Sequence, residues 1–368
     1  MFVRSRLSPA APVVLHVLAA GCMLALSCAM AVSPARSNER TAKQLFGAAA
    51  LPAEMKSQSI GFYSRGCMAG AVGMPVDGPN WQTMRLSRNR RWGHPVLVGI
   101  LEDLSVKAAR EGWSGLMVGD MSQPRGGPML TGHASHQIGL DADIWFTPMP
   151  PERLSYEQRE SLSAISMLAD KSNHVDDARW TRAHENLLRT AASYKEVERI
   201  LVHPGIKKKL CDTVKGDRAW LAKIRPNWGH NYHFHLRIAC QDGSPDCRKQ
   251  NPAPGGQGCD ASLDWWFNVG LAPKKKPAKP VKPKPELRLS DLPSACGAVL
   301  DAPAKPADEA DLKVRDAGFS APAITIPAHD PALARRSKPI EAKGASAATP
   351  VSAPPPGAIP TPTRRPRD

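Results

Sequence analysis

The sequence predicts an α+β domain in which helices cover a small antiparallel sheet, followed by a disordered C-terminal tail rich in Pro, Lys and Ala. Two short segments of alternating polarity, residues 141–146 and 233–238, indicate the sheet. Apolar residues that recur at helical spacing around these segments indicate the covering helices. The tail is indicated by composition, because much of the +15 net charge and many of the 36 prolines fall near the ends of the 368-residue chain.

Each of the two predicted strands has an apolar face and a polar face. Successive side chains of a strand point to opposite sides of the sheet. In residues 141–146 the apolar positions alternate with carboxylates, and in residues 233–238 they alternate with imidazoles and a guanidinium. An antiparallel pairing would bring Asp143 near His235. We therefore expect one side of the sheet to carry the polar set Asp141, Asp143, His233, His235 and Arg237.

Helices and further strands are predicted from apolar periodicity and from end signals. A helix opens at His94 and Pro95 and closes at Gly112. The core side of a second helix is marked by Leu162, Ile165 and Leu168. The remaining predictions are helices over 155–170 and 177–194, strands over 116–118 and 199–202, a basic helix starting at 206–210, and some helical tendency over 38–57.

Imidazoles and carboxylates gather in the same two regions of the chain. Such a cluster suits a divalent transition metal better than it suits a packed core. We expect a zinc site on the sheet face, held by His136, Asp143 and His235, with Gly139 allowing a close backbone approach where the loop enters the strand. Three protein ligands leave a fourth position for water, which is the catalytic form of a zinc site.

The other polar residues are assigned roles around this ion. His233 is expected to act as general base or to stabilise the developing oxyanion, and His230 is the second candidate for the same work. Asp141 is expected to orient an imidazole rather than to bind metal. The alternative for any of these residues is an ordinary surface or supporting position.

The pattern resembles the penicillin-insensitive murein endopeptidases, which belong to a wider group that includes lysostaphin, the D-alanyl-D-alanine metallopeptidases and the hedgehog signalling domain. The group's pattern is His, six intervening residues, Asp, and later His-x-His, filled here by His136, Asp143 and residues 233–235. The resemblance covers roughly residues 58 to 300. It extends to the stretches 87–90, 93–95, 119–121 and 132–143 and to Cys240.

The resemblance implies a zinc-dependent murein endopeptidase that hydrolyses D-alanyl-meso-diaminopimelyl cross-links in peptidoglycan and is insensitive to penicillin. A Ser-x-x-Lys motif backed by the rest of the serine acyltransferase constellation is lacking, which agrees with insensitivity to β-lactams. The nearest alternative is a zinc D,D- or L,D-carboxypeptidase that trims stem peptides. A zinc-stabilised binding module without catalysis is disfavoured by the complete run over residues 132–143.

A second metal site is a lesser alternative. Members of the family carry an Asp and a His in about the place of Asp170 and His174, although the spacing here is one residue longer. Together with His133, these residues would form the second site. The competing interpretation is that Asp170 and His174 flank a helix end.

The N-terminal 31 residues predict a secretory signal peptide. Arg4 and Arg6 precede an apolar run that ends in small residues. A retained membrane anchor is the main alternative, and a lipoprotein cleavage site at Cys22 is a minor one. We expect a periplasmic protein with no stable membrane span after signal removal, comprising an N-terminal extension over 32–57 and a zinc peptidase domain over 58–271.

Removal of the signal peptide leaves six cysteines, an even number that favours three disulfides in an oxidising compartment. The sequence alone leaves their pairing open. The resemblance implies pairs of Cys67 with Cys296, Cys211 with Cys259, and Cys240 with Cys247. The first pair would fasten the far end of the domain to its beginning.

The C-terminal part is dominated by Pro, Lys and Ala. Residues 272–300 are predicted to be an extended linker returning to Cys296, and residues 301–368 a disordered basic tail. The tail suits tethering to an anionic envelope polymer or a membrane surface, with solubility and spacing as the alternative. Nucleic acid is discounted, since the chain lacks a platform of basic and aromatic residues. The expected partner is the peptidoglycan substrate. The sequence leaves the oligomeric state open, and a dimer is one of the alternatives.

Overall fold

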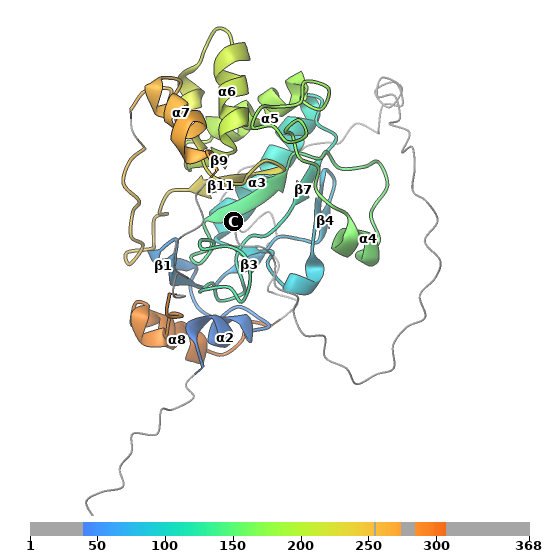
Figure 1. The fold of residues 1–368 in the computed structure, drawn as a ribbon. Helices are drawn as coiled ribbons and strands as arrows, with labels where there is room; N and C mark the ends of the chain where they lie inside the picture. Colours follow the sequence, from blue (N-terminus) through green and yellow to red (C-terminus); the bar gives the residue numbers. More distant parts are fainter. Residues whose placement is uncertain (1–39, 254, 274–283, 307–368) are drawn as a thin grey trace, which may run out of the picture. The chain divides into compact units, whose positions relative to one another are not determined.

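The computed structural model describes residues 40–253, 255–273 and 284–306 (Figure 1). These residues belong to one compact unit. The predicted signal peptide and the predicted tail beyond residue 306 lie outside the described residues. Among the described residues, no helix has the length and apolar character needed to cross a membrane.

A seven-stranded mixed sheet lies at the centre of the described unit, in the order β10-β9-β11-β8-β7-β5-β4. The two predicted strands are neighbours in it. They run antiparallel, with His235 directly opposite Asp143, as their alternation predicts. The strands are β4 (Asp77–Gly78), β5 (Trp81–Thr83), β7 (Leu116–Val118), β8 (Asp141–Trp145), β9 (Val197–Val202), β10 (Ile224–Pro226) and β11 (His233–Ile238).

The sheet differs from the small antiparallel sheet that was expected, because two of its pairings are parallel. Parallel neighbours need a crossover connection. Helix α3 (Pro95–Arg110) supplies it between β5 and β7, and α6 (Pro204–Thr213) with the 3₁₀ turn η2 (Ala219–Lys223) supplies it between β9 and β10. β5 and β10 have three residues each, too few for an alternating pattern to reveal them.

Helices α3, α6 and α5 (Arg182–Ser193) share the main apolar core with one face of the sheet. Helix α3 begins where predicted, and the His94 ring accepts a hydrogen bond from the backbone N–H of Val96 through Nδ1 at 3.3 Å. This packing leaves the opposite face of β8 and β11 for the polar set. The inward residues of these strands are those expected, namely Ala142, Ile144, Phe146, Phe234, Leu236 and Ile238.

The helix predicted over residues 155–170 is wrong in its length. Helix α4 spans only Tyr156–Ser161. Leu162 and Ile165, which were expected on the core side, are 38% and 51% exposed. The helix predicted over 177–194 is present as α5, but it begins later than predicted.

Two antiparallel ribbons lie outside the main sheet. β1 (Gln58–Phe62) pairs with β2 (Arg65–Ala69), and β3 (Val72–Gly73) pairs with β6 (Trp92–Gly93). The first ribbon packs with α2 (Ala42–Gly47) and α8 (Ala295–Asp301) in a second, smaller apolar core. These two helices lie together below β1 in Figure 1.

Part of the predicted extended linker is folded, which corrects the expected end of the domain at residue 271. Residues 274–283 lie outside the described residues, but the stretch from 284 contains η4 (Leu289–Asp291) and α8. Leu292 and Val299 are buried there against the second core. The composition predicted an extended linker because Pro and Lys dominate this stretch, and its few buried apolar residues were too few to change that prediction.

All three disulfides implied by the family resemblance are present, with Cα–Cα distances of 5.7, 5.6 and 5.8 Å. The pair Cys67–Cys296 ties β2 to α8, so it closes the second core as expected. The others are Cys211–Cys259 and Cys240–Cys247. The remaining short elements are η1 (Leu86–Arg88), α7 (Ala261–Trp265) and the π-helical turn η3 (Trp266–Gly270).

Candidate metal centre

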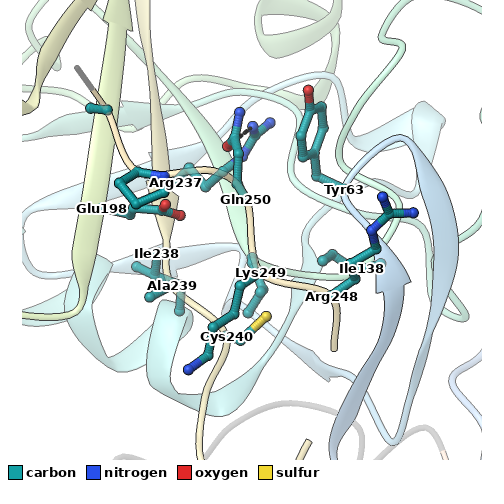
Figure 2. A pocket seen from close by; sticks show the side chains of 13 residues that line it. Tyr63, Ile138, Glu198, Arg237, Ile238, Ala239, Cys240, Arg248, Lys249 and Gln250 are labelled. Atoms are coloured by element: carbon teal, nitrogen blue, oxygen red, sulfur yellow. Dashed lines mark hydrogen bonds between the residues drawn. The ribbon is translucent and has the colours of Figure 1, made fainter. Parts of the chain in front are cut away.

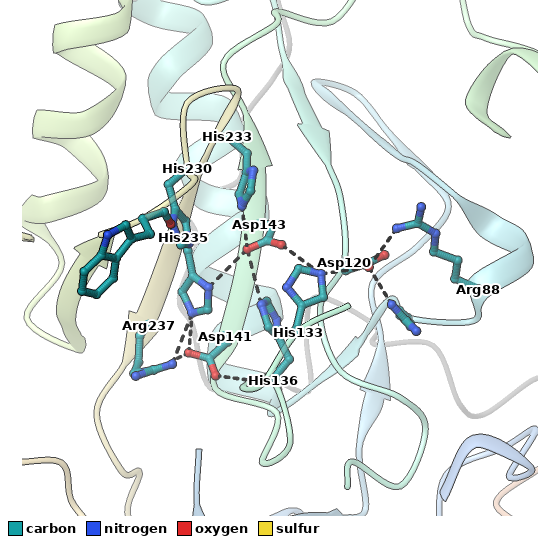
Figure 3. Close-up of polar contacts among 12 residues, drawn as sticks. Arg88, Asp120, His133, His136, Asp141, Asp143, His230, His233, His235 and Arg237 are labelled. Carbon is teal, nitrogen blue, oxygen red and sulfur yellow. Dashed lines mark hydrogen bonds and ion pairs between the residues drawn. The ribbon is translucent and has the colours of Figure 1, made fainter. Parts of the chain in front are cut away.

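The carboxylate of Asp143 lies in the middle of four imidazoles on the polar face of the sheet (Figure 3). The three predicted ligands, His136, Asp143 and His235, are brought together. Asp143 Oδ2 lies 3.5 Å from Nε2 of His133. Its Oδ1 lies 3.4 Å from Nε2 of His136, 3.3 Å from Nδ1 of His235 and 3.6 Å from Nε2 of His233.

His136 reaches this position through an unusual backbone conformation. Its φ of 65° is left-handed, which residues with a side chain rarely adopt, and such conformations cluster at functional sites. The backbone N–H of His136 donates to Asp141 Oδ2 at 3.1 Å. Nearby, Gly139 has φ 71°, and a Cβ there would lie 2.9 Å from the Met68 sulfur. Glycine is therefore required at the strand entry, as predicted.

The hydrogen bond on one side of His235 determines what its other nitrogen can do. Nε2 lies 2.9 Å from a carboxylate oxygen of Asp141, so it carries a hydrogen and donates. In the neutral ring Nδ1 then has a lone pair, and this lone pair faces Asp143 Oδ1 at 3.3 Å. Two electron-rich atoms at this distance repel each other unless a cation or a proton lies between them.

Several buried atoms of the centre have no hydrogen-bond partner among the described residues. They are both ring nitrogens of His136, Oδ1 of Asp143 and Nδ1 of His233. Buried unpaired polar atoms are rare, because each costs free energy. Ligand atoms of His133, His136 and Asp143 all lie within 4.8 Å of one another. This donor set of imidazoles and a carboxylate fits a divalent metal ion.

Asp141 is fully buried and contacts several groups of the centre, and the orienting role expected for it stays a prediction. Besides His136 and His235, it accepts a hydrogen bond from Nε of Arg237. Burial alone would raise the pKa of Asp141, but the Arg237 guanidinium and the His235 ring lower it well below its usual value. Asp141 therefore stays charged and holds two ligand-bearing segments together.

Arg237 has a role that the sequence pattern did not assign. Its guanidinium stacks over the ring of Tyr63 at 3.8 Å and donates to Oε1 of Gln250 at 2.9 Å. These contacts hold the guanidinium group of Arg237 against the carboxylate of Asp141. The available signal was its position two residues after His235 on the same strand face.

A third carboxylate, Asp120, also approaches the centre and was not assigned a role from the sequence. Its Oδ2 lies 3.1 Å from Nε2 of His133, 3.0 Å from Nη1 of Arg88 and 2.9 Å from Nη1 of Arg90. Burial would raise the pKa of Asp120, but the His133 hydrogen bond and the two guanidinium groups lower it to about 2. The available signal was its position just after β7, where the chain leaves a buried strand.

His233 and His230, the two candidates for the general base, lie beside the ligands. Burial lowers the pKa of His233, whereas Asp143 opposes this shift. His230 has a left-handed φ of 57°, and its Nδ1 donates to the Trp228 carbonyl at 2.7 Å. Burial and the neighbouring rings of His235 and His233 lower the pKa of His230 to about 3. Its Nε2 is consequently a free acceptor at neutral pH.

The residues considered for a second metal are not brought together. The Asp170 side chain is 91% exposed and lies 3.7 Å from Nη2 of Arg179. His174 is exposed and stacks on the ring of Phe267. Of the three candidates only His133 belongs to the group of described residues, with His136 and Asp143, whose ligand atoms lie close enough together to hold a metal ion. A second ion stays a prediction.

A cleft of about 440 Å³ adjoins the centre through Arg237 (Figure 2). Its lining includes Arg237, Tyr63, Arg248 and Lys249, but none of the clustered histidines. Arg237 thus lines the cleft and also contacts the carboxylate of Asp141.

Comparison with known proteins gives a consistent result. Residues 59–301 match the family described as penicillin-insensitive murein endopeptidase. Relatives with that name include one from Yersinia enterocolitica, 40% identical over 250 residues, which are 68% of this chain and 88% of the relative. One from Klebsiella pneumoniae is 40% identical over 67% of this chain and 86% of its own length. One from Haemophilus influenzae is 41% identical over 67% of this chain and 84% of its own length.

Proposed function

Since the chain belongs to the penicillin-insensitive murein endopeptidase family, we propose that it is a zinc-dependent enzyme that hydrolyses D-alanyl-meso-diaminopimelyl cross-links in peptidoglycan. The observation that carries the zinc assignment is the convergence of unpaired buried atoms, namely both ring nitrogens of His136, Oδ1 of Asp143 and Nδ1 of His233, with Nδ1 of His235 3.3 Å from the same carboxylate oxygen. Imidazole and carboxylate ligands are those that zinc takes in catalytic sites. When bound, the ion supplies Lewis acidity toward a peptide carbonyl and toward water.

The protein's own residues supply the proton transfers. We assign the general base to His233, whose ring lies 3.6 Å from Asp143 and is kept neutral by burial. It accepts the proton of the attacking water and returns it to the amine of the leaving group as the C–N bond breaks. His230 is the alternative, because its Nε2 is left as an acceptor by the bond from Nδ1 to Trp228.

Orientation of the ligands is assigned to the buried pair Asp141 and Arg237. A ligating imidazole commonly donates its other N–H to a carboxylate, which fixes the tautomer and the direction of the ring. Asp141 does this for His235, and Arg237 keeps Asp141 ionised. The side chains of the centre are therefore held in place before metal or substrate binds.

The chain's charge and disulfides fit a cell-wall enzyme outside the cytoplasm. The net charge of +15 suits an acidic polymer such as peptidoglycan. Three disulfides fit an oxidising compartment, and we propose the periplasm. The signal peptide that would direct export lies outside the described residues.

Digestion of intact sacculi tests the proposal and separates it from the carboxypeptidase alternative. An endopeptidase converts cross-linked muropeptide dimers to monomers, whereas a carboxypeptidase releases free D-alanine. We expect dimers to disappear without release of D-alanine, in the presence of penicillin as well as in its absence. Removal of metal with a chelator should stop the reaction, and added zinc should restore it. Release of D-alanine without loss of dimers would favour the alternative.

A further inference from the structure

Three tryptophans gather on the surface next to the metal centre, and we call Trp228, Trp265 and Trp266 the tryptophan platform. Trp228 is 51% exposed and Trp265 is 45% exposed. The ring centroids of Trp228 and Trp266 are 4.5 Å apart, and those of Trp265 and Trp266 are 5.4 Å apart, both edge to face. Large aromatic side chains seldom stay half exposed as a group unless the surface has a binding role.

The platform is built so that its position relative to the metal centre is fixed. The indole N–H of Trp228 donates to the Gly270 carbonyl at 2.9 Å, which ties the loop before β11 to the end of η3. The carbonyl of Trp228 accepts from His230 Nδ1. Tyr232, which is 41% exposed, continues the aromatic surface toward His233, with ring centroids 4.5 Å apart. Tyr232 thus connects the tryptophan platform to His233 along the loop that enters β11.

The two segments that carry the platform have little charge of their own, although Arg225 precedes the first and Lys274–Lys276 follow the second in the sequence. Residues 227–235 and 261–271 contain no Lys or Arg, although the chain as a whole has 49 of them. The one formal charge in these two stretches, with His neutral, is the exposed carboxylate of Asp264. Anionic phospholipid surfaces attract clustered basic residues, and the platform has none of its own. The expected ligand is therefore uncharged where it meets the rings.

We propose that the tryptophan platform binds the glycan strand of peptidoglycan by stacking its indole faces on pyranose rings, which holds the strand while its cross-link reaches the metal centre. A pyranose ring has an apolar face of C–H groups and a rim of hydroxyl groups, so it can pack on an aromatic face and keep its rim hydrated. This inference rests on the proposed function, since it names the part of that substrate which the platform would hold.

The test compares two substrates in the full-length, zinc-loaded enzyme. One is intact sacculi, and the other is the cross-linked peptide dimer freed from its glycan. Replacing Trp265 with Ala should lower kcat/KM on sacculi about tenfold more than on the free dimer, the size expected from losing roughly one stacking contact. Trp265→Phe, which keeps an aromatic face, should recover most of this difference. Equal losses on both substrates would overturn the proposal.

A matched control is Tyr156→Ala, which removes an aromatic ring that is 52% exposed on α4, far from α7 in Figure 1. It should leave the ratio between the two substrates unchanged. A Tyr156 variant with the same selective loss on sacculi would contradict a specific platform.

Binding without catalysis gives a second readout, which still decides the question if neither substrate is cleaved and the proposed function fails. Titration with an oligosaccharide of N-acetylglucosamine should change the tryptophan fluorescence of the wild-type protein, and Trp265→Ala should lose this response. Vesicles containing phosphatidylglycerol should give no response. Binding to these vesicles that depends on Trp265, with no response to the oligosaccharide, would identify the platform as a membrane contact and overturn the proposal.

Discussion

Asp143 and His235 are directly opposite each other on neighbouring antiparallel strands, with Oδ1 of the carboxylate 3.3 Å from Nδ1 of the imidazole. Their contact is a consequence of strand register. A slip of one residue would turn every side chain of β11 to the other face, which would place Phe234 or Leu236 where His235 now lies. The burial of Phe234 and Leu236 in the main core therefore holds the metal centre in place.

Replacing His235 with Ala should abolish stoichiometric zinc binding while the fold persists. The imidazole faces the carboxylate of Asp143, and the hydrophobic residues on either side of it hold the strand. Metal content after dialysis measures the effect, with circular dichroism as the check on folding. His174→Ala is the matched control, because that exposed imidazole should not change zinc content. Full zinc occupancy in the His235 variant would remove this residue from the ligand set.

Asp141→Asn should weaken zinc binding without removing it, by roughly 10- to 100-fold in affinity. Asparagine is close to aspartate in size, but it is neutral, so it gives up the charge that Arg237 and His235 now contact. Competition with a chromogenic chelator would measure the change. Asp170→Asn, at a carboxylate that is 91% exposed, should have no such effect. Unchanged affinity in the Asp141 variant would show that the ring of His235 is oriented by other contacts.

His233→Ala should keep its zinc and lose turnover by roughly 10² to 10⁴, the usual contribution of a positioned acid or base. His230→Ala provides the comparison, because both rings are neutral and both lie near the ligands. Turnover of the free cross-linked dimer and metal content should be measured together. If the His230 variant shows the larger loss with metal retained, the roles of the two histidines are the reverse of those proposed.

The central part of the site could be predicted because it depends on local pattern. Alternation determines which side chains of a strand share a face, so residues 141–146 and 233–238 revealed their polar sides without any knowledge of the fold. Asp120 could not be assigned in this way, since its partners lie far away in sequence, whereas the pairing that sets His235 opposite Asp143 also sets Arg237 opposite Asp141. The contact of Asp120 with Arg88 and His133 depends on the order of strands in the sheet.

The error at residues 155–170 has a similar cause. Spacing favoured a longer helix, but the guanidinium of Arg85 donates to the carbonyls of Arg159, Glu160 and Leu162. Continuation of the helix would need those carbonyls for its own hydrogen bonds. A residue more than seventy positions away therefore ends α4, and no local pattern carries that information.

Glu102→Gln should remove a pH-dependent loss of stability. Glu102 lies in α3 with 7% exposure, its Oε1 has no partner among the described residues, and burial raises its pKa from 4.5 to about 7. Between these values the folded protein binds more protons than the unfolded chain, so stability falls as pH rises through this window and stays lower above it. The glutamine variant lacks this titration.

Chemical denaturation of both proteins at pH 5 and pH 8 measures the effect. The free energy of unfolding of Glu102→Gln minus that of the wild type should be larger, in the stabilising direction, at pH 8 than at pH 5. Other titrating groups, including the metal ligands, are common to both proteins and cancel in the difference. A difference that is the same at both pH values would show that Glu102 is ionised in the folded protein as easily as in the unfolded chain.

Removing the Cys67–Cys296 disulfide should cost more stability than removing Cys240–Cys247. A cross-link restricts the unfolded chain more when it closes a longer loop, and the two separations are 229 and 7 residues. On chain entropy alone the double alanine variants should differ by on the order of 3 kcal/mol. Denaturant unfolding of Cys67→Ala/Cys296→Ala and Cys240→Ala/Cys247→Ala measures this. Both should keep their zinc, because neither pair contacts the ligands. Equal losses would mean that packing of α8 against β2 already restricts the chain ends when the disulfide is absent.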